Sequence, residues 1–208
     1  MAFLSIKKLI PQGTNEALVC GLDEVGRGPW AGPIVACAFM FTKTLKLINL
    51  NDSKHLSEER RNEFYKLFET EAAYGIGITQ PHEIDELGLL KANNLAFTRA
   101  LEQLKHKGYV PEFILVDGRD RLNLPHPWKT LIKGDEKIKL IACASIMAKV
   151  VRDELMNELA QKYPLYGFES HKGYGTQEHQ QALKKHGACE IHRKSFAPIH
   201  QLLQLTID

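Results

Sequence analysis

Two apolar runs near the N-terminus meet at a turn sequence, and this pair constrains the fold more than any other feature of the chain. Residues 17–28 and 31–42 are rich in Val, Ile, Ala and Phe, and the letters GPWAGP at their junction are typical of a turn. The pattern predicts two consecutive strands that pair as a hairpin. We therefore expect a sheet that begins with these two strands.

The rest of the chain alternates between strand-like and helical spacing. Short apolar runs predict three further strands, at AAYGIGIT, EFILVDG and the beginning of WKTLIKGDEK. A hairpin followed by alternating helices and strands predicts an α/β fold with a mixed sheet. The predicted helices are the segment after the N-cap candidate Ser57, residues 82–107 with a break at Gly88, residues 139–162, and about 177–187.

The composition is that of an ordinary globular protein. Hydrophobic residues make up 44% and charged residues 25% of the 208 residues, and the formal net charge is +2. A surface that binds a polyanion must therefore be local. No repeat or flexible linker interrupts the sequence, so we expect a single domain over residues 1–208, with an extension at about 1–16 and a C-terminal segment at about 163–208.

The four cysteines stand alone, at Cys20, Cys37, Cys143 and Cys189, without the CxxC spacing of a zinc cage or redox motif. We expect free thiols in a reducing compartment. The N-terminus lacks the pattern of a signal peptide, and no apolar run approaches the roughly 20 residues that span a bilayer. The expected location is the cytoplasm, without membrane contact.

Four carboxylates lie within or just after the predicted strands. Asp23 and Glu24 are inside the first apolar run, Asp117 closes FILVD, and Asp135 follows WKTLIKG. Because sites in open α/β sheets gather at strand ends, we expect these side chains to converge. Clustered carboxylates repel one another, and a divalent cation relieves that repulsion. Oxygen donors favour Mg²⁺ or Mn²⁺ over Zn²⁺, and two such ions suit an in-line phosphoryl displacement.

A structural role is the alternative for each of these acids. Asp beside Gly is a common turn sequence, so Asp117 and Asp135 taken singly also fit ordinary turns. The alternative is weaker for Asp23 and Glu24, because two adjacent acids are rare inside an apolar run.

Glycines flank Arg27 in Gly26-Arg27-Gly28, directly after the paired acids. The glycine spacing does not fit a dinucleotide-binding fingerprint, and no helical pattern follows. Glycines here allow the backbone to approach a ligand closely with its N–H groups. A β-bulge or tight bend explains the same letters and stays open as an alternative.

Two later stretches carry groups that bind polyanions. Residues 129–152 contain six basic and two acidic residues. The stretch SHKGYGTQEH offers His171, Lys172 and Tyr174 in a glycine-rich setting, suited to phosphate contact and to stacking on a sugar or base. A solvated surface loop is the alternative for this stretch.

Taken in order, these motifs resemble the ribonuclease HII (type 2 ribonuclease H) family, bacterial type. The resemblance covers about residues 17–198, and its motifs are DEVGRGPWAGP, LNDSKHLS, PHEIDELG, LVDG, KGD, ACASIMAKVVRD, YGFESHKGYGT and HRKSFAP. It implies a ribonuclease H-like mixed five-stranded sheet flanked by helices, with a C-terminal helical segment that contacts the substrate. It also implies two-metal-ion hydrolysis of the RNA strand of RNA–DNA hybrids, and cutting 5′ to single ribonucleotides embedded in duplex DNA, with 3′-hydroxyl and 5′-phosphate ends.

The resemblance assigns the metal ligands and catalytic residues to the same carboxylates that the strand ends indicate, Asp23, Glu24, Asp117 and Asp135. The implied cofactor is Mn²⁺ or Mg²⁺, and the implied cellular roles are DNA replication and ribonucleotide excision repair. We expect a monomer.

Substrate contacts are implied for the Gly26-Arg27-Gly28 turn and for Tyr174, which together are expected to recognise the ribose 2′-hydroxyl. Lys54 and Lys172 are expected to contact phosphates. The final letters QLLQLTID faintly resemble a tail that binds a sliding clamp, although a closing amphipathic turn is the favoured interpretation.

The chain departs from the family pattern at two places. Trp30 stands where an aliphatic residue is expected, and Arg119-Asp120 where an uncharged residue is more usual. These departures concern the shape of the cleft and leave the carboxylates unchanged.

Two other functions stay open. The same four acids suit a two-metal nuclease or phosphatase that ignores the 2′-hydroxyl, and the substrate's sugar distinguishes that enzyme. A non-catalytic nucleic-acid-binding domain is the second alternative, which metal dependence distinguishes; four uncompensated carboxylates hinder the binding of a polyanion.

Overall fold

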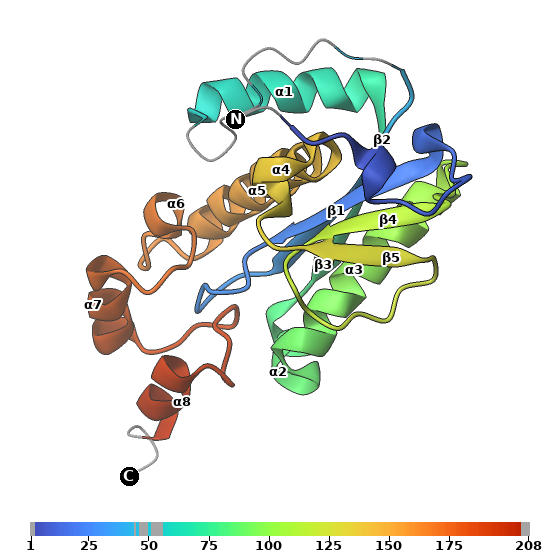
Figure 1. Ribbon diagram of the computed structural model, residues 1–208. Coiled ribbons are helices and arrows are strands. Elements are labelled where there is room, and N and C mark those ends of the chain that lie inside the picture. Colours follow the sequence, from blue (N-terminus) through green and yellow to red (C-terminus); the bar gives the residue numbers. More distant parts are fainter. Residues whose placement is uncertain (1–2, 44, 46–49, 51–55, 205–208) are drawn as a thin grey trace.

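The computed structural model describes residues 3–43, 45, 50 and 56–204. Its centre is a five-stranded sheet with the order β3-β2-β1-β4-β5 (Figure 1). β1 pairs antiparallel with β2 and parallel with β4, so the sheet is mixed, as expected. β3 extends the antiparallel side and β5 the parallel side. The strands are β1 (Val19–Val25), β2 (Ile34–Phe41), β3 (Ala72–Thr79), β4 (Phe113–Asp117) and β5 (Trp128–Leu131).

Helices cover both faces of this sheet (Figure 1). α1 (Glu58–Glu71) and α5 (Lys139–Lys162) lie on one face, and α2 (Pro81–Leu87) and α3 (Leu89–His106) on the other. Ser57 caps α1, since its side chain accepts a hydrogen bond from the Arg60 N–H. Two short 3₁₀ helices precede β1, at Ile6–Lys8 and Glu16–Leu18.

The alternation of side chains along the strands divides the core into two layers. In β2, Val35, Cys37 and Phe39 pack toward α1 and α5, whereas Ala36 and Ala38 pack toward α3. A strand covered on both faces has no polar side, which accounts for the uninterrupted apolar sequence of β2.

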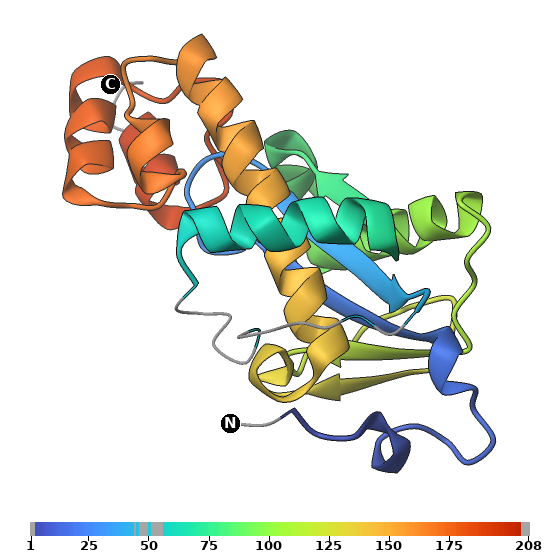
Figure 2. The same cartoon turned by 90° about the horizontal axis from the view of Figure 1, so that it is seen from above.

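The C-terminal helices gather around the last turns of α5, at one end of the molecule (Figure 2). The connection between β1 and β2 enters this region. Trp30 donates its N–H to the Gly173 carbonyl at 2.8 Å, and Arg193 donates its N–H to the Trp30 carbonyl at 2.8 Å. The connection after the first strand is thereby joined to residues 143 and 163 positions later in the chain. These helices are α6 (Phe168–His171), α7 (Gln177–His186) and α8 (Ala197–Gln204).

The hairpin, the three later strands, the break at Gly88 and the predicted helices are confirmed. The placement of Asp135 at a strand end is wrong. β5 ends at Leu131, and Asp135 lies in the four-residue helix α4 (Gly134–Lys137). The sequence pattern did not indicate α6 or α8.

The cysteines are free thiols, and all except the half-buried Cys189 are buried. Within the described ranges, no helix is both long and apolar enough to cross a membrane.

Candidate active site

The paired strands β1 and β4 bring Asp23 and Asp117 together. Leu22 is the register partner of Val116 in this parallel pair, so the residues that follow them lie side by side. Glu24 follows on β1 with its side chain on the opposite face. Asp23 is only 5% exposed, whereas Glu24 and Asp117 are half-buried. A strand fixes the direction of its side chains, so these carboxylates are held on a rigid support.

Asp135 reaches this site by way of α4. The backbone N–H of Gly134 donates a 2.5 Å hydrogen bond to Oδ1 of Asp117. A Cβ atom at Gly134 would lie 2.7 Å from Cδ1 of Ile141 and 3.3 Å from the same Asp117 oxygen. Glycine is therefore required for α4 to approach the end of β4 so closely. Asp135, the next residue, is 6% exposed and interacts electrostatically with Asp117.

The carboxylates disfavour one another's ionised forms. Burial raises the pKa of Asp23 well above its usual value, and the charges of Glu24 and Asp117 raise it further. Burial also raises the pKa of Glu24, although the nearby charge of Arg27 opposes this. For Asp117, burial raises the pKa, the Gly134 N–H lowers it, and the charge of Asp135 raises it. This cluster would gain stability from a bound cation.

Two polar residues that the sequence reasoning missed support the acids from the flanking helices. Ser145 of α5 forms a side-chain hydrogen bond with Asp23, which favours the ionised form. Asn93 of α3 does the same for Glu24 and is itself buried. Its Oδ1 atom is buried without a hydrogen-bond partner among the described residues. An Asn at a core position of an amphipathic helix was the available signal.

The donor set fits a hard divalent cation. The four side chains offer carboxylate oxygens, the ligands that Mg²⁺ and Mn²⁺ prefer. In the ranges that the structure describes, no three His, Cys, Asp or Glu side chains are already arranged as a metal centre. Glu24 and Asp135 do line one pocket of about 190 Å³, which Arg61 and Lys149 also line. The acids thus converge on one region without forming a closed cage.

The Gly26-Arg27-Gly28 turn begins immediately after β1. Gly26 has φ +96°, and a Cβ atom there would lie 2.2 Å from Nε of Arg152. Both the backbone conformation and the close approach require glycine. The Arg27 guanidinium lies between two acids, with Nη1 3.3 Å from Glu24 Oε1 and 2.6 Å from Asp120 Oδ2. The acid of the unusual Arg119-Asp120 pair therefore contacts this turn directly.

Two fully buried arginines support the turn from behind. Arg193 donates to the carbonyl oxygens of Gly26, Arg27 and Gly32 at 2.5–3.0 Å. Arg152 donates from Nε to the Pro33 carbonyl at 3.0 Å. Burial, together with the nearby charge of Arg152, lowers the pKa of Arg193 to about 9. The available signal for Arg152 was a charged position on an otherwise buried face of α5.

Tyr174 lies beside the same turn. A Cβ atom on Gly28 would be 3.7 Å from Cε1 of Tyr174, so the ring faces the glycine, and the side chain is 44% exposed. The Lys172 ammonium donates to Asn157 Oδ1 at 2.5 Å and to the Glu169 carbonyl oxygen at 2.6 Å. Lys54 is outside the described residues.

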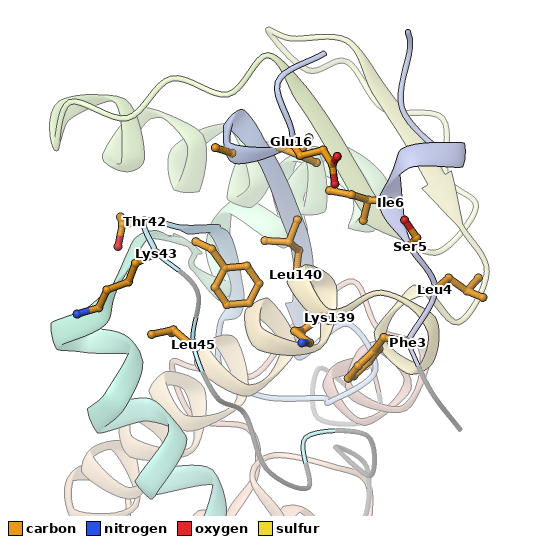
Figure 3. A pocket seen from close by; sticks show the side chains of 13 residues that line it. Phe3, Leu4, Ser5, Ile6, Glu16, Thr42, Lys43, Leu45, Lys139 and Leu140 are labelled. Carbon is orange, nitrogen blue, oxygen red and sulfur yellow. The ribbon is translucent and has the colours of Figure 1, made fainter. Parts of the chain in front are cut away.

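A larger pocket of about 630 Å³ lies elsewhere (Figure 3). The N-terminal segment around Phe3 and Ile6, the end of β2 at Phe41 and the start of α5 at Leu140 line it. None of the predicted site residues lines this pocket. Two of the acids, Glu24 and Asp135, line the smaller pocket instead.

Comparisons with known proteins identify the family of this chain. A sequence model of the ribonuclease HII family matches residues 20–199. Ribonuclease HII of Maricaulis maris is 45% identical over 207 residues, which cover 94% of this chain and 93% of the relative. The crystal structure of ribonuclease H2 from Pyrococcus horikoshii superposes with a TM-score of 0.74 at 26% identity, covering 91% of this chain and 99% of the other. The structure of Bst-RNase HIII in complex with Mn²⁺ has the same fold, with a TM-score of 0.68 at 20% identity over 93% of this chain and 71% of the other. Sequence, fold and acidic site together place this chain in the ribonuclease HII family, and it is a metal-dependent ribonuclease.

Proposed function

We propose that the protein hydrolyses the RNA strand of RNA–DNA hybrids and cuts 5′ to single ribonucleotides embedded in duplex DNA, leaving 3′-hydroxyl and 5′-phosphate ends. The observation that carries this proposal is the adjacency of two features. The Gly26-Arg27-Gly28 turn begins directly after the strand that bears Asp23 and Glu24. A sugar bound at the turn has its phosphodiester next to the carboxylates.

Recognition of a lone ribonucleotide requires a local contact with its 2′-hydroxyl, since the rest of the duplex is DNA. The turn offers backbone groups that hydrogen-bond a hydroxyl, and the exposed ring of Tyr174 beside Gly28 offers a surface for the sugar. A site built to hydrogen-bond a hydroxyl discriminates strongly against a substrate that lacks it. The proposal therefore predicts selectivity for ribose over deoxyribose at one position.

The proposed metal ligands and catalytic residues are Asp23, Glu24, Asp117 and Asp135. Bound Mg²⁺ or Mn²⁺ ions supply activation of water and stabilisation of the leaving oxygen. The chain's own contribution is orientation: the Gly134 N–H fixes one oxygen of Asp117, and Arg27 and Asn93 hydrogen-bond Glu24. The mutual repulsion of these acids supports a role in cation binding.

Phosphate contacts are proposed for Lys172 and Lys54. Such contacts position the duplex but do not distinguish one base sequence from another. Lys172 is a suitable contact because its ammonium is fixed beside the loop that carries Tyr174. Its alanine variant should weaken binding to all duplexes alike and flatten the salt dependence of binding.

The test is cleavage of a DNA duplex that contains one ribonucleotide, with Mg²⁺, Mn²⁺ or a chelator, by the wild-type protein and by Asp117→Asn. The expected result is a metal-dependent cut 5′ to the ribonucleotide, which the variant loses and an all-DNA duplex does not undergo. Equal cutting of the all-DNA duplex would show a nuclease that ignores the 2′-hydroxyl. Absence of any cut by folded, metal-saturated protein would refute the proposal.

A further inference from the structure

Three buried histidines lie directly behind Tyr174. His171 ends α6, His179 is in the first turns of α7, and His192 lies just before Arg193. The rings of His171 and His179 stack with centroids 4.6 Å apart, and Nε2 of His179 lies 3.0 Å from Nε2 of His192. The catalytic carboxylates make no contact with this group, and the proposed chemistry does not use it.

The hydrogen-bond partners fix where each proton lies. His179 Nδ1 is 2.9 Å from the Tyr174 carbonyl oxygen, which only accepts, so this nitrogen carries the proton. In a neutral ring, Nε2 of His179 is then an acceptor, and Nε2 of His192 must donate to it. This leaves His192 Nδ1 as an acceptor for the Cys189 N–H at 2.9 Å. The same nitrogen also lies 3.1 Å from Cys189 Sγ and 3.3 Å from the Cys189 carbonyl oxygen.

All donors in this series point in one direction, from Cys189 through His192 and His179 to Tyr174. The backbone of Tyr174 is held on both sides, because its N–H also donates to the His171 carbonyl at 2.9 Å. His171 itself lies outside the series. Its Nε2 is 2.7 Å from the Tyr166 carbonyl oxygen, and its Nδ1 accepts from the Gly173 N–H at 3.3 Å.

We propose that the neutral His192–His179 pair is a positioning device that holds Tyr174 against Gly28 in the orientation needed to recognise a ribonucleotide. This inference rests on the proposed function, because it assigns a purpose to the placement of Tyr174. Neither histidine touches substrate; both act through the tyrosine backbone.

The surroundings favour a neutral pair. The aromatic rings of Trp30 and Phe168 contact His179, and those of Tyr166 and Phe168 contact His192. The titratable groups that face the pair are His171 from α6, Tyr166 from the preceding loop and Cys189. No carboxylate is among these described contacts, so nothing there offsets the charge of a second proton. A proton added to His179 would place two N–H groups against each other or displace the Cys189 N–H from its acceptor.

Two substitutions at position 179 separate positioning from packing. His179→Asn keeps a donor attached to Cγ, where Nδ1 stands, but leaves a void. His179→Phe fills the space and removes the donor. If His179 serves only packing, His179→Phe should exceed His179→Asn in both thermal stability and kcat. If His179 has a positioning role, His179→Phe should be the more thermally stable variant. His179→Asn should then have the higher kcat on a duplex with one embedded ribonucleotide.

We expect kcat to fall about tenfold in His179→Phe and to stay within about threefold of wild type in His179→Asn. In a Tyr174→Ala background, His179→Phe should cause no further loss, because the device acts through that residue. His186→Phe is the matched control, since His186 is on the same helix but exposed. ¹⁵N NMR of the imidazoles should show the proton on Nδ1 of His179 and on Nε2 of His192.

The outcomes are distinguishable. Suppose the wild-type protein cuts at the ribonucleotide but the order of the two variants is the same in kcat as in stability. The positioning role is then refuted and the proposed function stands. Reversed tautomers in the NMR spectra would have the same meaning. If the wild-type protein does not distinguish the ribonucleotide from DNA, the proposed function fails first and this inference fails with it.

Discussion

Arg193 and Gly26 are 167 positions apart in the chain, yet Nη2 of the arginine donates a 2.5 Å hydrogen bond to the glycine carbonyl oxygen. The same guanidinium also binds the carbonyls of Arg27 and Gly32. One buried side chain therefore fixes both ends of the connection between β1 and β2. The C-terminal segment thus determines the shape of a turn that follows the first strand.

Arg193→Lys should loosen this turn. Lysine retains the charge but cannot reproduce the forked geometry, so most of the hydrogen bonds to carbonyl oxygens are lost. We expect a loss of about 2–4 kcal/mol in the free energy of unfolding and a drop of about tenfold or more in cleavage at an embedded ribonucleotide. Denaturant titration and steady-state kinetics measure the two effects. Lys194→Ala, at the exposed neighbouring residue, is the control and should change neither.

Asp117→Asn should separate stability from activity. The substitution removes one charge from a cluster of mutually repelling acids, while the amide oxygen can still accept the Gly134 N–H. The melting temperature in chelator should rise, by about 2–4 °C for each kcal/mol gained. Activity should fall below about 1% of wild type, because a lost metal ligand costs several kcal/mol of transition-state stabilisation. Asp153→Asn, whose acid pairs with Lys149 at 2.7 Å, should retain activity. A variant that is both active and destabilised would contradict the assigned role.

Divalent cations should stabilise the folded protein through the same acids. At a metal concentration 100-fold above its dissociation constant, the expected gain is about 2.7 kcal/mol for one site. Scanning calorimetry with Mg²⁺, Mn²⁺ or chelator measures it without substrate. Asp117→Asn should show a smaller gain, and an equal gain in both proteins would place the metal elsewhere.

Tyr174→Ala should impair cleavage at an embedded ribonucleotide more than Tyr174→Phe. The ring packs beside Gly28. We expect the ring to supply most of the contact with the sugar of the substrate, and the hydroxyl a smaller share. We expect a loss of about tenfold or more for Ala and of no more than about threefold for Phe. Single-turnover rates on the ribonucleotide-containing duplex test this ranking, and equal losses in the two variants would disprove it.

Acid should destabilise the fold through the buried histidines. Burial lowers the pKa of His179 and of His192 to about 4, from an ordinary value of 6.5. Between these values the unfolded chain binds more protons than the folded protein, so the free energy of unfolding falls as the pH drops from about 6.5 to about 4. Above about pH 6.5 both states hold neutral histidines, and the free energy of unfolding does not depend on these groups. Denaturant titrations across this window should show a smaller slope for His179→Phe than for wild type. Parallel curves would mean that His179 does not titrate as the structure indicates.

The sequence by itself determined the strand pair and the alternation of helices and strands, since the spacing of apolar residues is a local property. It also placed Asp23 and Glu24 within β1 and Asp117 at the end of β4, where the structure has them. It did not place Asp135 correctly, because Gly134-Asp135 suits a turn after a strand as well as the first turn of a short helix. Only the tertiary structure showed how Arg152 and Arg193 support the Gly-Arg-Gly turn and how His192 and His179 reach Tyr174. Those contacts join residues far apart in the chain, and a buried Arg or His has the same letter as an exposed one. Which side chains are buried together depends on the packing of the whole chain, and no local pattern records it.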